Sequence, residues 1–173
     1  MQTTDDGTYL ELDGRPAVRF ERVYPHPVER VWHAITDPEE LRHWFPSPDV
    51  TYEPRPGGSM TLAGDPYAPE PRTSRVLVWE PPTRFSFEWE GDELHFTLSA
   101  YGDGCRLELV DVLSSDGAAS RNAAGWEMCL ADLDRRLRGA ARGEGGRAEF
   151  ERVLAKYRDR QLPDDGWLPD EPM

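Results

Sequence analysis

Histidine is the first residue type to consider for chemistry, because its pKa lies near neutrality and its ring commonly binds metals. The four histidines are His26, His33, His43 and His95. No two of them have the spacing of an HxxxH or HExxH pair on one helical face. His33 also lies off the apolar stripe of its predicted helix, so we expect it to face solvent. The sequence therefore predicts no metal site.

His95 is the best single candidate for a general acid or base. It alternates with Leu94 and Phe96 along a predicted strand, so it shares the other strand face with Ser99. If that face is concave, His95 could exchange protons with a substrate, with Ser99 or Asp111 as polar partners. A cyclase, aromatase or lyase is thus one hypothesis, which an exposed His95 would exclude.

Other motifs for covalent or phosphate chemistry favour structural roles. The chain has no GxSxG motif, and Cys105 and Cys129 lie among apolar positions, where buried free thiols are the usual outcome. Gly57 and Gly58 stand between two predicted strands, whereas a phosphate-binding loop leads into a helix. We therefore predict a hairpin turn there and expect no cofactor.

Composition limits the class of protein. The chain has 173 residues, of which 38% are hydrophobic, as expected for one folded domain. No run approaches the roughly 18 apolar residues of a membrane span, and no secretion signal is apparent at the start. The net charge of −13 disfavours nucleic acid as a partner. With two cysteines, too few for a disulfide framework, we expect a cytoplasmic, acidic protein.

The periodicity of apolar residues predicts the elements that position these side chains. A hairpin turns at Asp13-Gly14, with Val18, Phe20 and Val23 as inward candidates. A short helix covers 28–35, and a second begins with Asp37 as N-cap and ends near Trp44 and Phe45. An antiparallel meander follows over 49–113, in the segments VTYE, SMTLAG, SRVLVWE, RFSFEWE, LHFTLSAY and CRLELVDVL.

Two helices are predicted after the meander. The longer one covers about 119–141, with Trp126, Leu130, Leu133 and Leu137 on one face, and should lie across the sheet. A further helix covers about 147–160. The last residues, 161–173, are acidic and are expected to be flexible.

This order of elements resembles the START-like helix-grip fold, an α+β fold also called Bet v 1-like, in which a curved antiparallel sheet wraps around a long C-terminal helix. The similarity covers about residues 15–141. It is carried by RFERVYPHPVERVWHAITDPEELRHWF, by RPGG at 55–58, by WEPPTRFSFEW at 79–89 and by GWEMCLADL at 125–133. These strings resemble the branch of the SRPBCC superfamily that includes homologues of the activator of heat-shock protein 90 ATPase.

The sequence pattern and the resemblance together predict a domain organisation and two kinds of partner. Residues 1–14 would form an N-terminal hairpin strand, 15–142 the START-like domain, 143–160 an extra helix and 161–173 a flexible tail. Small bacterial relatives resemble carriers or sensors of apolar molecules, so a hydrophobic small molecule is the expected partner. A chaperone or other protein is the alternative partner, although the eukaryotic activator engages its chaperone through a separate N-terminal domain that the first 14 residues are too few to form.

In such a fold the sheet and the long helix enclose a cavity, and aromatic side chains could line it. A ligand site of this kind would have a volume of roughly 300–1,000 Å³, whereas a protein-interaction module would have a filled interior and an exposed apolar patch. The alternative role of the same rings is to fill the core. The candidate ligand-binding residues are Trp44, Phe45, Phe87, Trp89, Phe96 and Trp126.

Overall fold

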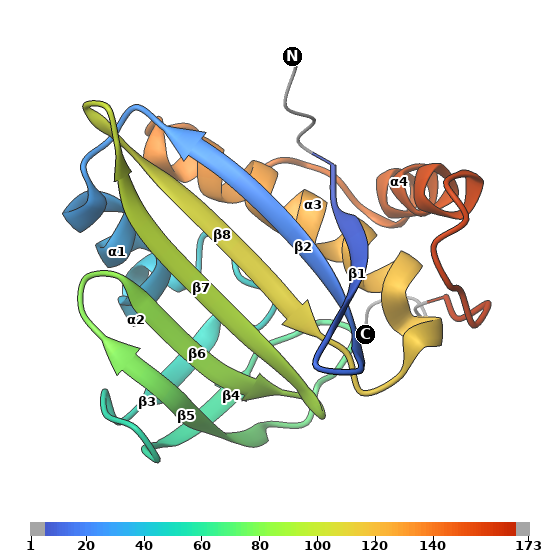
Figure 1. The fold of residues 1–173 in the computed structure, drawn as a ribbon, viewed down its shortest axis with the longest axis horizontal. Helices are drawn as coiled ribbons and strands as arrows, with labels where there is room; N and C mark the ends of the chain where they lie inside the picture. The colour runs from blue at the N-terminus through green and yellow to red at the C-terminus, as the bar shows by residue number, and fades with distance from the viewer. Residues whose placement is uncertain (1–5, 169–173) are drawn as a thin grey trace.

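A computed structural model describes residues 6–168, and in it one long helix lies across one face of a single antiparallel sheet (Figure 1). The sheet order is β1-β2-β8-β7-β6-β5-β4-β3. The strands are β1 Thr8–Leu12, β2 Arg15–Tyr24, β3 Asp49–Tyr52, β4 Ser59–Ala63, β5 Arg72–Glu80, β6 Arg84–Trp89, β7 Asp92–Tyr101 and β8 Gly104–Val112. The helices are α1 Val28–Thr36, α2 Pro38–Leu41, α3 Ala119–Leu137 and α4 Arg147–Asp159, with a 3₁₀ turn at Asp116–Ala118. The predicted helix-grip fold is confirmed.

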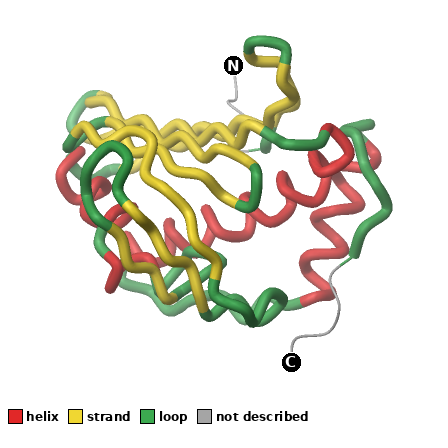
Figure 2. Tube along the Cα trace, turned by 90° about the horizontal axis from the view of Figure 1, so that it is seen from below, coloured by secondary structure: helices red, strands yellow, loops and turns green. Residues whose placement is uncertain are grey.

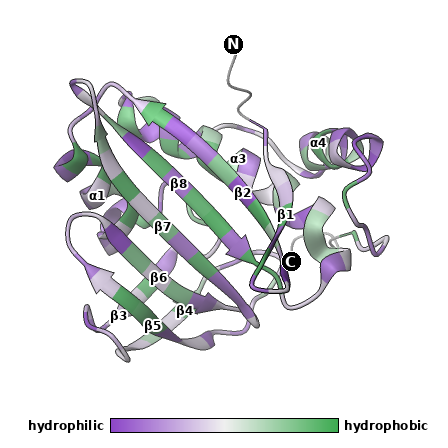
Figure 3. Cartoon of the chain, in the orientation of Figure 1, coloured by the Kyte–Doolittle hydropathy of each residue, from purple (hydrophilic) through white to green (hydrophobic). Residues whose placement is uncertain are grey.

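The sheet is curved, and the helices lie on its concave side (Figure 2). Alternation along the strands creates these two faces: Leu94, Phe96 and Leu98 of β7 are buried, while the residues between them are more exposed. Figure 3 shows the same alternation as green and purple bands along the central strands. Trp126 and Leu130 of α3 are buried as their helical spacing predicts.

The first hairpin illustrates how local sequence sets the register. Asp13 and Gly14 both have positive φ, 51° and 79°, as in a type I′ turn, whose twist matches that of the paired strands. The predicted inward position of Val23 is wrong, since 52% of this residue is exposed. Phe20 points inward, and Val23 lies an odd number of residues away, so it occupies the opposite face.

Two predicted helix ends lie earlier in the structure. The α2 helix ends at Leu41, and the chain continues in a turn to Phe45, whose amide still donates to the Leu41 carbonyl at 2.8 Å. The α3 helix ends at Leu137 rather than 141 because Gly139, with φ of 74°, terminates it. A linker of residues 138–146 then leads to α4.

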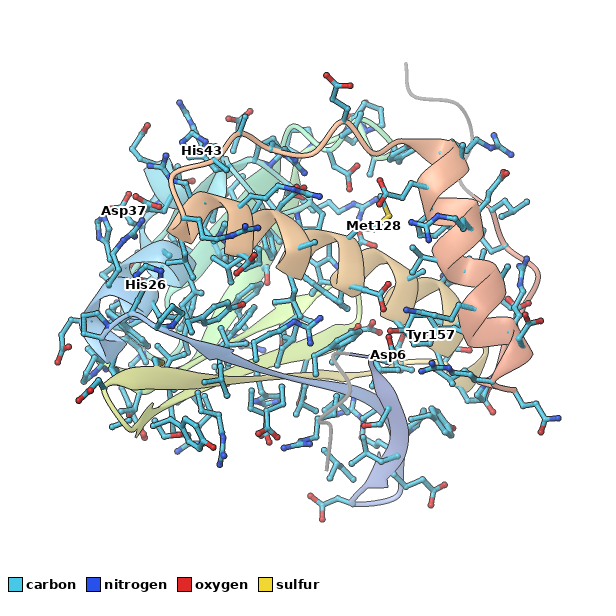
Figure 4. All side chains as sticks on the ribbon, turned by 90° about the horizontal axis from the view of Figure 1, so that it is seen from above. Asp6, His26, Asp37, His43, Met128 and Tyr157 are labelled. Carbon is cyan, nitrogen blue, oxygen red and sulfur yellow. The ribbon has the colours of Figure 1, made fainter. Side chains whose placement is uncertain are left out.

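The segments that flank the fold are fastened to it. The Tyr157 hydroxyl of α4 accepts a hydrogen bond from the Gly7 amide at 2.8 Å, and the two segments lie side by side in Figure 4, where Asp6 and Tyr157 are labelled. After α4, the Leu162 and Pro163 carbonyls each accept a hydrogen bond of 2.9 Å from Ser120 at the start of α3. The acidic segment expected to be flexible is thus held to α3 here, and 169–173 lie outside the described residues.

Candidate functional site

The six aromatic residues expected to bind a ligand lie together between the sheet and α3, and all six are buried. Phe45 is at the centre of the cluster, with ring centroids 5.6 Å from Trp44, 5.1 Å from Trp89 and 5.9 Å from Trp126. The Trp44 indole also donates to the Ala34 carbonyl at 2.9 Å. These edge-to-face and tilted contacts fill the space between sheet and helix. The ligand-binding role assigned to these residues stays a prediction.

A pocket of about 480 Å³ lies beside this cluster, on the flank of α3. Five stretches of chain frame it: the turn before β3, the loop between β4 and β5, α3, the linker with the start of α4, and the segment after α4. Figure 4 shows the labelled Met128 side chain extending from α3 toward this space. The lining residues are Pro46, Pro48, Asp65, Pro66, Tyr67, Gly125, Met128, Cys129, Ala131, Asp132, Arg142, Gly143, Gly145, Gly146, Glu149, Phe150 and Trp167.

None of the six predicted aromatic residues lines this pocket. Two of the lining residues, however, are next to predicted residues in the sequence. Pro46 follows Phe45, and Gly125 precedes Trp126. A Cβ atom placed at Gly125 would have no neighbour within 4 Å outside its own helix backbone, so the missing side chain leaves open space on this flank of α3.

Asp132 fastens the linker to α3 and so forms one wall of the pocket. Its carboxylate accepts hydrogen bonds from the Arg135 side chain at 2.7 Å, the Arg142 side chain at 3.1 Å and the Gly143 amide at 2.9 Å. Three donors around one carboxylate also neutralise its charge toward the pocket.

Cys129 lines the pocket but is not a reactive thiol. Burial raises the pKa of Cys129 to about 12, so the thiol stays protonated at neutral pH. The nucleophilic form of cysteine is the thiolate, which is therefore absent at neutral pH. The charges of Arg142, Asp132 and Asp65 also act on this pKa, which places all three groups within electrostatic reach of the same thiol.

The part of the chain that carries most of this geometry is similar to a known family. A model of the family described as Activator of Hsp90 ATPase homolog 1-like protein matches residues 25–138. The chain belongs to this family. No curated protein matches the sequence closely enough to count as a relative.

Solved structures similar to this family member cover from 76% to 94% of the chain. CalU16 from Micromonospora echinospora is 26% identical, with a TM-score of 0.68, and the match covers 94% of this chain and 96% of that one. A conserved protein of unknown function from Enterococcus faecalis, 16% identical with a TM-score of 0.73 and 90% coverage of both chains, shows the fold alone. DynU16, from the dynemicin biosynthetic locus, is 25% identical with a TM-score of 0.64, over 76% of this chain and 51% of that one.

The match to the Activator of Hsp90 ATPase homolog 1-like family includes only part of the pocket lining. It includes the α3 residues and the two loops on the sheet side, but it stops at residue 138. The linker, the start of α4 and Trp167 lie beyond it and supply the remaining wall. The pocket therefore combines residues inside the family match with residues beyond it.

In this family member His95 lies on the outer face of the sheet, away from α3. Its ring contacts the Ser86 hydroxyl at 2.8 Å and the Glu93 carboxylate at 3.2 Å, and a third of its side chain is exposed. Ser99 shares that face, whereas Asp111 points inward to α3. The three residues do not converge, so the cyclase site expected of them is not formed. His33 is exposed, as predicted.

Asp111 belongs instead to a buried polar cluster that spacing alone did not single out. Its Oδ2 accepts from the Trp126 indole at 3.0 Å and from Asn122 at 2.9 Å, and Asn122 also donates to Asp92. Burial, and then the neighbouring Asp92, raise the pKa of Asp111 well above its usual 3.8. The Asp92 carboxylate also lies close enough to share a hydrogen bond with a protonated Asp111.

Over residues 6–168, no group of three or more histidine, cysteine, aspartate or glutamate side chains is arranged to hold a metal ion. Within the same range, no helix has the length and apolar character needed to cross a membrane.

Proposed function

We propose that the protein binds an apolar or aromatic small molecule, without transforming it, in the pocket beside α3. The observation that carries this proposal is the pocket itself. Its volume of about 480 Å³ falls within the usual range for small-molecule sites. Its walls combine apolar surface from Met128, Phe150 and Trp167 with a few charged groups, which is the common composition of such sites.

The chemistry of the surrounding residues supports binding rather than catalysis. Cys129 is the nucleophile type nearest at hand, and its pKa of about 12 keeps it protonated. His95 faces away from α3 and the pocket. The family and the structural neighbours support a ligand-binding domain, and DynU16 is named for a biosynthetic locus.

A second candidate function is a protein-interaction module, favoured by apolar side chains at the far end of the sheet. Val23 and Tyr101 are 52% and 51% exposed and line a shallow surface depression together with Pro25. Exposed apolar surface of this kind marks many protein contacts.

The test is native mass spectrometry of protein purified from a rich expression host, before and after denaturing extraction. A reproducible small adduct is expected on the wild type. Gly125→Leu would fill the open space beside α3 and should abolish the adduct, while Gly125→Ala, the matched control, should retain it. An adduct that survives in Gly125→Leu would place the ligand elsewhere. No adduct at all, with a partner protein retained on gentle purification, would favour the interaction module.

A further inference from the structure

The charged groups of the pocket are unequal in number. Three carboxylates, from Asp65, Asp132 and Glu149, and one guanidinium, from Arg142, belong to its lining. The inference below rests on the proposed function, because it concerns the ligand of that same pocket.

The Asp132 carboxylate is paired with two guanidinium groups. Arg142 donates to Asp132 at 3.1 Å, and the same carboxylate also accepts from Arg135 at 2.7 Å. An anionic ligand would have to compete with this carboxylate for both arginines. The single positive charge of the lining is therefore already engaged inside the protein.

The other two carboxylates are not neutralised in this way. Asp65 caps its own loop by accepting from the Tyr67 amide at 2.8 Å, and it has no ion pair within residues 6–168. Among the described residues Glu149 pairs with Arg152 alone, at 3.5 Å, and the Arg152 side chain is 73% exposed, so solvent screens the pair. Asp65 comes from the sheet side of the pocket and Glu149 from α4, so the uncompensated charge is contributed from two walls.

Aromatic rings line the same pocket as these carboxylates. Tyr67 comes from the same loop as Asp65, and Phe150 from the same first turn of α4 as Glu149. Aromatic faces attract cations through the ring quadrupole, and they also cover the apolar part of a ligand. Carboxylates and aromatic rings both favour a positively charged ligand.

We propose that the pocket selects an organic cation, a protonated amine carried on an aromatic or aliphatic body. The ammonium group lies toward Asp65 and Glu149, and the body lies against Met128 and the neighbouring rings. The open space beside Gly125 accommodates the body.

Three probes of matched shape test the proposal: 2-(1-naphthyl)ethylamine, 2-(1-naphthyl)ethanol and 1-naphthylacetate, which are cationic, neutral and anionic at pH 7. Binding is followed by the methyl resonance of Met128 in methionine-methyl-labelled protein. We expect the amine to bind about tenfold more tightly than the alcohol, with the carboxylate weakest, because each exposed carboxylate contributes about twofold to fivefold. High salt should reduce the advantage of the amine over the alcohol.

Glu149→Gln and Asp65→Asn should each weaken amine binding by about twofold to fivefold. Glu144→Gln is the matched control, because Glu144 lies in the same linker region, is exposed and does not line the pocket. It removes the same charge and should leave amine binding within error of the wild type.

The results distinguish selection of a cation from binding of small molecules in general. If the alcohol binds as tightly as the amine, or if Glu144→Gln weakens the amine as much as Glu149→Gln does, the charge selection is refuted while the binding site stands. If none of the three probes shifts Met128, the proposed binding function of this pocket fails, and the inference fails with it.

Discussion

The buried carboxyl of Asp111 makes the stability of this protein depend on pH in a way that one substitution should remove. Asp111 is fully buried, and its pKa is raised well above 3.8 by burial and by Asp92. Asp111→Asn keeps an oxygen that can accept from Trp126 and Asn122, and its amide group can donate to Asp92. The variant is thus close to a permanent copy of the protonated side chain.

Whether stability rises or falls with pH depends on how many protons Asp111 binds in the folded and in the unfolded state. The unfolded chain releases the Asp111 proton near pH 3.8, while the folded chain retains it to higher pH. Folding stability contributed by this group is therefore greatest below pH 3.8, and it decreases as pH rises until the raised pKa of the folded state is reached. The steepest slope is about 1.4 kcal/mol per pH unit for one proton. Asp111→Asn lacks this slope.

Urea unfolding, followed by tryptophan fluorescence at intervals from pH 4 to pH 8, measures the difference. The difference in free energy of unfolding, Asp111→Asn minus wild type, should increase by about 1 kcal/mol per pH unit over the first pH units above 3.8. Asp103→Asn, in the exposed turn between β7 and β8, is the control and should run parallel to the wild type. A constant difference between Asp111→Asn and the wild type at every pH would refute the reasoning.

Trp44, Asp132 and Cys129 each have a role that a substitution or a reagent can test. Trp44→Ala should lower the free energy of unfolding by about 3–5 kcal/mol, because it leaves a cavity in a filled core; a small loss with strongly weakened ligand affinity would instead favour a direct binding role. Asp132→Asn should detach the linker and speed trypsin cleavage at Arg142 severalfold, while thermal unfolding shifts by only a few degrees; unchanged cleavage would contradict the fastening role. Cys129 should resist iodoacetamide at pH 8 in the folded protein, since its pKa is about 12, and react once urea unfolds it; rapid labelling of the native protein would show that the thiol is neither buried nor protonated.

Alternation and helical spacing were sufficient for the fold because the core is periodic. Leu94 and Phe96 of β7 and Trp126 of α3 are buried where their periods place them. The same parity correctly put His95 and Ser99 on one face, but parity cannot tell which face is concave. That depends on where α3 packs, which is a tertiary property.

The pocket could not be found by the same means. Apart from α3, its walls come from turns, a proline-rich loop, a glycine-rich linker and Trp167. Side chains in such segments do not alternate regularly, so the sequence does not show which of them point inward. Asp111 did leave a signal, since it interrupts the inward series Cys105, Leu107, Leu109 of β8 with a charged residue. A carboxyl at an inward strand position indicates a buried polar cluster.

The pocket has walls on both sides of residue 138, so its shape depends on how the C-terminal segment is seated on α3. Val153, Leu154 and Tyr157 of α4 are buried in the same core as the apolar side chains of α3. A substitution that loosens α4 would therefore lower folding stability and displace a pocket wall at the same time. Ligand choice and stability are coupled through α4, so a change in one constrains the other.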